Sequence, residues 1–105
     1  MSRVVFIHAH GEGKSTREVQ IRDGKVSKRD VKDAINSLFN SYDKKVRNNQ
    51  SAERARDKLI RFVDNAGTIS GKGMGQNTYS SESFNDSDLR GYHMDIEFDT
   101  EVTFS

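Results

Sequence analysis

The fold of this chain is decided by residues 27–47, which read SKRDVKDAINSLFNSYDKKVR. Ser27 is a good N-cap, and Asp30 three residues later can complete a capping box. Apolar residues then recur at spacings of three and four: Val31, Ile35, Leu38, Phe39, Tyr42 and Val46. This spacing predicts an amphipathic helix that begins at Lys28 and runs to about Arg47.

A second helix is expected after the polar residues 48–50. Ser51 can cap it, and Gly67 is placed to end it. Its apolar stripe consists of Ala52, Ala55, Leu59, Phe62, Val63 and Ala66. Two helices joined by a short polar link pack antiparallel, so we expect a helical pair.

Strand signals lie before this pair. Residues 3–10 are rich in β-branched and aromatic side chains, and residues 16–22 alternate between apolar and polar. The five residues 11–15 suit a hairpin connection. Asp23-Gly24 ends the second strand in a turn, and a short third strand is possible at Lys25-Val26.

After the helices, the periodic spacing of apolar residues first disappears and then returns. Residues 68–91 are dominated by Gly, Ser and Asn with no period, which predicts a long polar loop, either a binding loop or a disordered one. Residues 92–104 alternate again and predict one long strand. Its apolar side holds Met94, Ile96, Phe98, Val102 and Phe104.

These elements predict a single α+β domain spanning residues 1–105. An antiparallel sheet, made of the N-terminal hairpin and the long C-terminal strand, packs against the two antiparallel helices. The terminal strand either pairs with the first hairpin, sits at an edge, or pairs with a second subunit, so a homodimer is possible.

Composition excludes several classes. The 105 residues contain no Cys, which rules out disulfides, thiolate catalysis and Cys-based zinc sites. No apolar run approaches the ~18–20 residues of a membrane span, and the N-terminus lacks the order of a signal peptide. We therefore expect a cytoplasmic protein with no membrane partner.

The net charge of +1 hides a strong asymmetry. Residues 1–63 hold fifteen Lys and Arg against eight Asp and Glu, a net +7, whereas residues 64–105 hold two against eight, a net −6. Such asymmetry indicates either a nucleic-acid or protein partner for one half, or pairing of the two halves.

The acidic half contains a row of carboxylates on the expected last strand. Asp95, Glu97, Asp99 and Glu101 recur at every second residue, which would space them about 6.6–6.8 Å apart on one face. This spacing is comparable to that of successive phosphates, so the row could mimic nucleic acid toward a protein with a basic surface. The same site would include Glu82, Asp86 and Asp88. Alternatively, the row is neutralised within the chain or blunts a sheet edge.

The basic half contains a stripe on the second helix. Arg54, Lys58 and Arg61 stand at i, i+4 and i+7, a pattern that can follow a phosphate backbone and can equally be a solvated face. The alternative nucleic-acid or nucleotide site also includes three cations near glycines: Lys14, Lys72 and Arg90.

Two further motifs contain residue types that can bind phosphate or metal, or take part in catalysis. The run 13–16, Gly-Lys-Ser-Thr, resembles the end of a phosphate-binding P-loop, but His8 stands where the motif needs Gly and a strand follows instead of a helix. His8 and His10 share one side of a strand, and His93 lies on a possible neighbour, so a metal site or general acid–base site is conceivable. No other pattern supports either, and we expect no enzyme, metal or cofactor.

In overall character the chain resembles the small inhibitors that bacteriophages use against host defences, the anti-CRISPR proteins above all. This resemblance implies a non-enzymatic inhibitor, in the host cytoplasm, of a nucleic-acid-handling defence protein such as a CRISPR effector nuclease. The chain is also similar in size to phage proteins that sequester signalling nucleotides. That similarity would give a role to Lys14, Arg56 and Arg90, and it implies oligomerisation.

Overall fold

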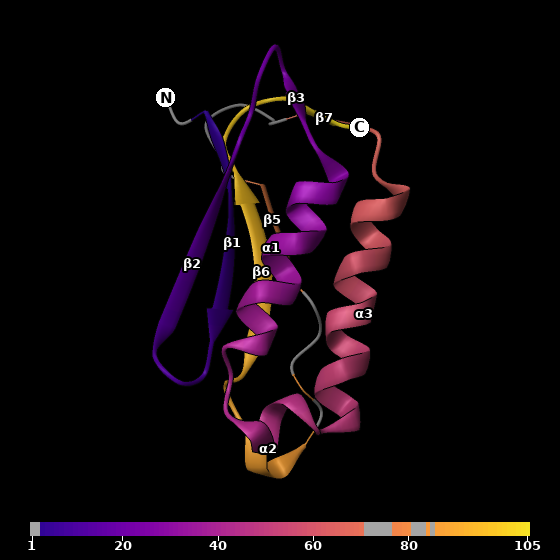
Figure 1. Ribbon diagram of the computed structural model, residues 1–105. Helices are drawn as coiled ribbons and strands as arrows, with labels where there is room; N and C mark the ends of the chain where they lie inside the picture. The colour runs from indigo at the N-terminus through magenta and orange to yellow at the C-terminus, as the bar shows by residue number, and fades with distance from the viewer. Residues whose placement is uncertain (1–2, 71–76, 81–83, 85) are drawn as a thin grey trace.

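The computed structural model describes residues 3–70, 77–80, 84 and 86–105, and these form the expected α+β architecture (Figure 1). The main sheet has four antiparallel strands in the order β2-β1-β6-β5. These strands are β1 (Val4–His10), β2 (Lys14–Gln20), β5 (Asn77–Ser80) and β6 (His93–Phe98). Of the alternatives for the terminal strand, pairing with the first hairpin is confirmed, because β6 lies beside β1.

Two long helices cover one face of the main sheet. They are α1 (Lys28–Asn40) and α3 (Gln50–Asn65), which run antiparallel as predicted, with the short α2 (Lys44–Arg47) between them (Figure 1). A 3₁₀ turn, η1 (Ser87–Leu89), lies close to α2 at one end of the molecule. None of the helices in the described part of the chain has the length and apolar character needed to cross a membrane.

The hydrophobic core fills the space between helices and sheet. The strand side chains that face the helices are completely buried or nearly so: Val5, Ile7 and Ala9 of β1, and Met94, Ile96 and Phe98 of β6. They meet the apolar stripes of α1 and α3, including Ile35, Leu38 and Leu59. Each large aliphatic side chain buried in this way contributes about 1.5–3 kcal/mol, so this layer supplies most of the stability.

The N-terminus of α1 agrees with the sequence, but its C-terminus does not. Ser27 is the N-cap, and its hydroxyl accepts a hydrogen bond from the backbone N–H of Asp30. The prediction of one helix to Arg47 is wrong, because α1 ends at Asn40. There the hydroxyl of Ser41 donates to the Leu38 carbonyl at 2.6 Å, competing with helix continuation.

The ends of α3 also differ from expectation. Asn49, not Ser51, is the N-cap, so the helix starts at Gln50. At the other end Ala66 has extended backbone angles, so Gly67 does not supply a left-handed helix cap. The predicted apolar stripe is nevertheless the buried one, since a shift of the cap leaves the 3.6-residue period unchanged.

The predicted single strand over residues 92–104 is in fact two strands in different sheets. The chain bends after Phe98, and β7 (Val102–Phe104) joins a small second sheet with β3 (Lys25–Val26) and β4 (Thr68–Ile69). In this sheet β3 is parallel and β4 antiparallel to β7. Both segments alternate, so the pattern alone did not reveal the bend.

The expectation of an unstructured connection over residues 68–91 is likewise corrected. This segment contains β4, β5 and η1, and the side chains of Phe84 and Leu89 are buried in the core. Backbone hydrogen bonds pair β4 with β7 and β5 with β6, and such bonds leave no pattern in the hydropathy of the sequence. The β2 strand also begins two residues earlier than predicted, which shortens the hairpin connection to residues 11–13.

Asn49 joins α3 to the η1 region and provides a test of this packing. Its side-chain oxygen accepts from Ala52 N–H at 3.0 Å, and its amide donates to Asp86 at 2.8 Å. That amide, followed by the backbone N–H of Asp88, lowers the pKa of Asp86. Because the folded-state pKa is the lower one, this stabilisation is present above the unfolded pKa of about 3.9 and is lost as pH falls through the folded pKa.

We predict that Asn49→Ala lowers the free energy of unfolding at pH 7 by about 1 kcal/mol through loss of the cap. Asn49→Asp keeps a capping acceptor but replaces the amide donor by a carboxylate next to Asp86, so loss of the hydrogen bond and charge repulsion should together raise the pKa of Asp86. Urea denaturation and carboxyl-carbon NMR titration measure the two effects. An unchanged pKa of Asp86 in Asn49→Asp would contradict the assignment.

Candidate functional site

The face of the main sheet opposite the helices holds a group of histidines and carboxylates. Alternation places His8 and His10 of β1, and His93, Asp95 and Glu97 of β6, on this face. The antiparallel register sets His10 opposite His93, and His8 opposite Asp95. We call these five residues the histidine–carboxylate cluster.

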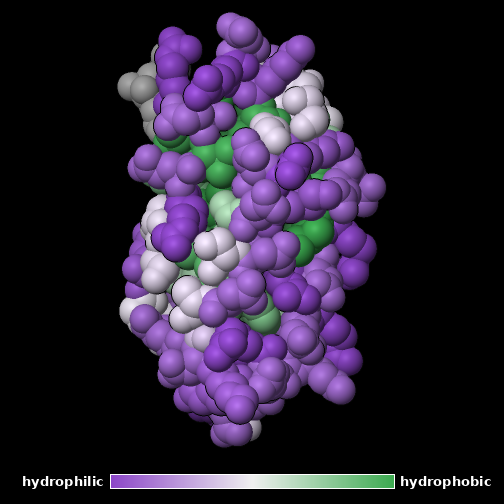
Figure 2. Space-filling view, viewed as in Figure 1, coloured by the Kyte–Doolittle hydropathy of each residue, from purple (hydrophilic) through white to green (hydrophobic). Residues whose placement is uncertain are grey.

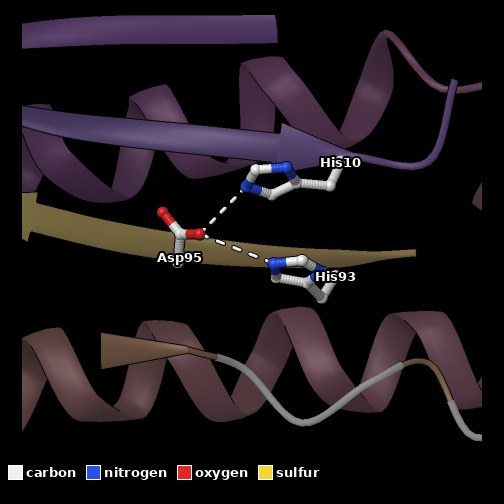
Figure 3. Close-up of side chains that lie close together, drawn as sticks. All are labelled: His10, His93 and Asp95. Atoms are coloured by element: carbon white, nitrogen blue, oxygen red, sulfur yellow. Dashed lines mark hydrogen bonds and ion pairs between the residues drawn. The ribbon is translucent and has the colours of Figure 1, made fainter. Parts of the chain in front are cut away.

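Asp95 is the centre of the cluster. It is only 7% exposed, and His10 Nε2 donates to its Oδ2 at 3.0 Å. The Nε2 atom of His93 lies 3.6 Å from the same oxygen, so both imidazoles point at one carboxylate (Figure 3). The rings of His10 and His93 are stacked, with centroids 4.1 Å apart and planes 12° from parallel.

The other carboxylate oxygen of Asp95, Oδ1, is buried and has no hydrogen-bond partner among the described residues. The nearest ring nitrogen, Nε2 of His8, is 4.0 Å away, too far for a hydrogen bond. A buried acceptor without a partner costs free energy, and such groups in folded proteins often mark a functional site.

His8 is held by other residues. Its Nε2 donates to Glu97 Oε1 at 3.2 Å, and its Nδ1 lies 2.9 Å from Thr16 Oγ1 on β2. Its ring also stacks on Phe6 at a centroid distance of 5.9 Å. Both ring nitrogens are therefore engaged, so His8 links three strands rather than adding a free ligand to the cluster.

Tyr42 supports the cluster from the core side of the sheet. Its hydroxyl donates to the His10 carbonyl at 2.6 Å, with the His93 carbonyl at 3.4 Å. Burial, and then the negative charge of Glu12, raises the pKa of Tyr42 far above its ordinary value, so the hydroxyl remains a donor. The break after α1 is what allows this side chain to reach both strands.

The turn after His10 has little freedom. Gly11 has φ of +131°, and a Cβ at this position would lie 2.2 Å from the Tyr92 ring. Glu12 in the same turn accepts a hydrogen bond from Asp43 N–H at 3.0 Å. These contacts fix the end of β1 and hence the position of the His10 ring.

The predicted acidic row is not one exposed line of charges. Asp95 is buried among the histidines, Glu97 contacts His8, and Asp99 and Glu101 follow the bend between the two sheets. Glu101 is exposed and accepts from Ser70 at 3.0 Å. Asp86 and Asp88 lie apart from the row at η1, and Glu82 lies outside the described residues. The expectation that this row presents all four carboxylates to a partner is corrected for Asp95, which is buried against His10 and His93.

The basic stripe is brought together as predicted. Arg54, Lys58 and Arg61 are all exposed on α3. Lys14 at the start of β2 and Arg90 after η1 are exposed on other elements, whereas Lys72 lies outside the described residues. Arg56 is half-buried instead, with its guanidinium 4.8 Å from the centre of the Phe39 ring and 3.0 Å from the Asp57 carboxylate.

A groove of about 560 Å³ between β2 and α1 was not anticipated from sequence. Figure 2 shows apolar surface in this region, framed by hydrophilic side chains. Its walls hold both cations and anions, among them Arg17, Arg22, Asp30 and Asp33. This mixture gives the groove no preference for a ligand of one charge.

Comparison with protein-family models, curated proteins and solved structures finds no match for this chain. The site is therefore argued from its own geometry. Sequence reasoning identified the three histidines but not that Asp95 is the common partner of His10 and His93. The missing signal was the register of β1 against β6, which pairs residues more than 80 positions apart.

Tyr42→Phe tests whether the core side holds the cluster together. The substitution removes the hydrogen bond from the hydroxyl to the His10 carbonyl, so we expect a loss of about 0.5–1.5 kcal/mol in the free energy of unfolding. Tyr92→Phe is the matched control, because its hydroxyl makes only a 3.5 Å contact with Glu12 and should change stability by less than about 0.5 kcal/mol. Equal effects in urea denaturation would argue against the support assigned to Tyr42.

Proposed function

We propose that the protein is a non-enzymatic nucleic-acid-binding protein that holds a sugar–phosphate backbone against α3. The observation behind this proposal is the exposed line along that helix. It consists of Gln50, Arg54, Lys58, Arg61 and Asn65, all exposed. The helical period places them on one face, and none of them is acidic.

The spacing of the cations suits a phosphate backbone. Arg54 and Arg61 are separated by about 10 Å along the helix axis, roughly the rise of three nucleotides in one DNA strand. The amide side chains at both ends of the line, Gln50 and Asn65, can donate hydrogen bonds to phosphate oxygens. The line belongs to the helical layer, while the histidine–carboxylate cluster is on the opposite face of the sheet, so binding at α3 does not require the cluster.

The test replaces the three cations together, as Arg54→Gln, Lys58→Gln and Arg61→Gln. Fluorescence anisotropy with labelled single-stranded and duplex oligonucleotides should show weaker binding at every sequence. The slope of log affinity against log salt should fall in magnitude by about 2–3, because each phosphate contact contributes about 0.7–0.9.

A control of equal charge change is available away from α3. Arg3, Arg22 and Lys25 are exposed near the second sheet, and their simultaneous replacement by Gln should leave the salt slope nearly unchanged. If the two triple variants lose affinity equally, the binding depends on net charge and not on α3. If the wild-type protein binds neither single-stranded nor duplex oligonucleotides at low salt, the proposal is wrong.

A second function, inhibition of a basic nucleic-acid-handling protein such as a defence nuclease, is supported by another observation. Glu97, Asp99 and Glu101 retain at least partial exposure within five residues of chain, next to the bend between the sheets. The net −6 of residues 64–105 adds to this surface. Because Asp95 is buried in contact with His10 and His93, this acidic surface is smaller than the four-residue row expected from sequence.

For this second function, we predict that Asp99→Lys with Glu101→Lys abolishes capture of a nuclease-resistant protein partner from bacterial lysate. Asp23→Lys with Asp33→Lys is the control, because it makes the same charge change elsewhere on the surface. Retention of the same partner by the first pair of substitutions would exclude this surface as the binding site. If the captured proteins are lost on nuclease treatment, the result would instead favour nucleic-acid binding through α3.

A further inference from the structure

We propose that His10, His93 and Asp95 form a binding site for a divalent transition-metal ion of the zinc type. Among the described residues, these three form a group that could hold a metal ion, and their ligand atoms all lie within 4.8 Å of one another. The proposal goes beyond nucleic-acid binding and does not depend on it.

The distances from the carboxylate to the two imidazoles fit a single ion. Zinc bonds of about 2.0–2.1 Å in tetrahedral geometry place neighbouring ligand atoms roughly 3.3 Å apart. Asp95 Oδ2 lies 3.0 Å from His10 Nε2 and 3.6 Å from His93 Nε2. The two imidazole rings are stacked in nearly parallel planes, so at least one ring must rotate about its side-chain bonds before both nitrogen lone pairs point at one ion beside the carboxylate (Figure 3).

Asp95 gives a second, independent indication. The residue is more than nine-tenths buried, yet its Oδ1 has no hydrogen-bond partner within the part of the chain that the structure describes. A cation bound beside this carboxylate would compensate the buried charge, which the present hydrogen bonds satisfy only at Oδ2. The donor set of two imidazoles and one carboxylate is one that zinc accepts, whereas Mg²⁺ and Ca²⁺ prefer oxygen ligands.

The surroundings allow an ion to enter and be held. The side chains of His10 and His93 are 25% and 35% exposed, so the cluster is open to solvent on the imidazole side. Three protein ligands leave the fourth zinc position for water or another small ligand. On the core side, Tyr42 holds the backbones of both histidines together, which limits the rearrangement that binding requires.

The experiment titrates ZnCl₂ into the metal-free full-length protein by calorimetry, and follows the imidazole nitrogens by long-range ¹H–¹⁵N NMR. We expect one zinc per chain, with shifts at Nε2 of His10 and His93. His10→Gln and His93→Gln should each raise the Kd more than about 100-fold, since even outer partners of such sites contribute about 10–100-fold. MgCl₂ at the same concentration should cause neither heat nor shifts.

His8→Gln is the matched control, because it removes an imidazole from the same strand and face that already contacts Thr16 and Glu97. It should change the Kd by less than about tenfold, the lower bound for an outer partner of a metal site. Circular dichroism in EDTA confirms that each variant is folded, and the NMR shifts of the wild type give a result that needs no variant.

Several results would overturn the proposal. They are the absence of zinc binding up to about 1 mM, a stoichiometry of one zinc per two chains, nitrogen shifts at His8 instead of His10 and His93, and retention of binding in His10→Gln or His93→Gln. An equal loss in His8→Gln and His10→Gln would also contradict the three-residue site.

Discussion

The antiparallel pairing of β1 with β6 is the contact on which the rest of the structure depends. It joins a strand from the basic part of the chain to one from the acidic part, and forms the centre of the main sheet. One face of this pair supplies the wall of the core, for example Ile7 opposite Ile96. Because side chains alternate, the same register sets His8 opposite Asp95 and His10 opposite His93 on the other face. A slip of one residue would destroy both the core and the cluster.

The strands do not pair in isolation, since elements from other parts of the chain hold them. Tyr42 bonds to the ends of both strands from the core side, and Thr16 reaches His8 from β2. The bend after Phe98 then sends the chain into the second sheet, where β7 lies between β3 and β4. That bend divides the carboxylates, because Asp95 stays inside the cluster while Glu101 reaches the surface. Among the described residues, the acidic half of the sequence contacts the basic half at Asp95, which lies against histidines, and at Asp64, which pairs with Lys32 at 2.7 Å.

The molecule presents two separate surfaces for binding. The helical layer offers the exposed cations Arg54, Lys58 and Arg61 on one face of α3, which suits an extended anion such as a phosphate backbone. The opposite face offers nitrogen and oxygen ligands around Asp95, which suit a small cation. Since the core lies between them, the two surfaces can be altered independently. The nucleic-acid proposal and the zinc proposal can therefore be tested separately.

The sequence by itself determined the elements whose signals are local. The cap at Ser27 follows from residue type, and the stripes of both helices follow from 3.6-residue periodicity. The first strand follows from its β-branched and aromatic side chains, and the second and the terminal strands follow from alternation. Only the tertiary structure decided the helix break after Asn40, the bend after Phe98 and the strands within residues 68–91. Backbone pairing and packing produce these features, and neither appears in side-chain periodicity. The histidine–carboxylate cluster belongs to the same category, because the neighbours of Asp95 are set by a register between strands at opposite ends of the chain.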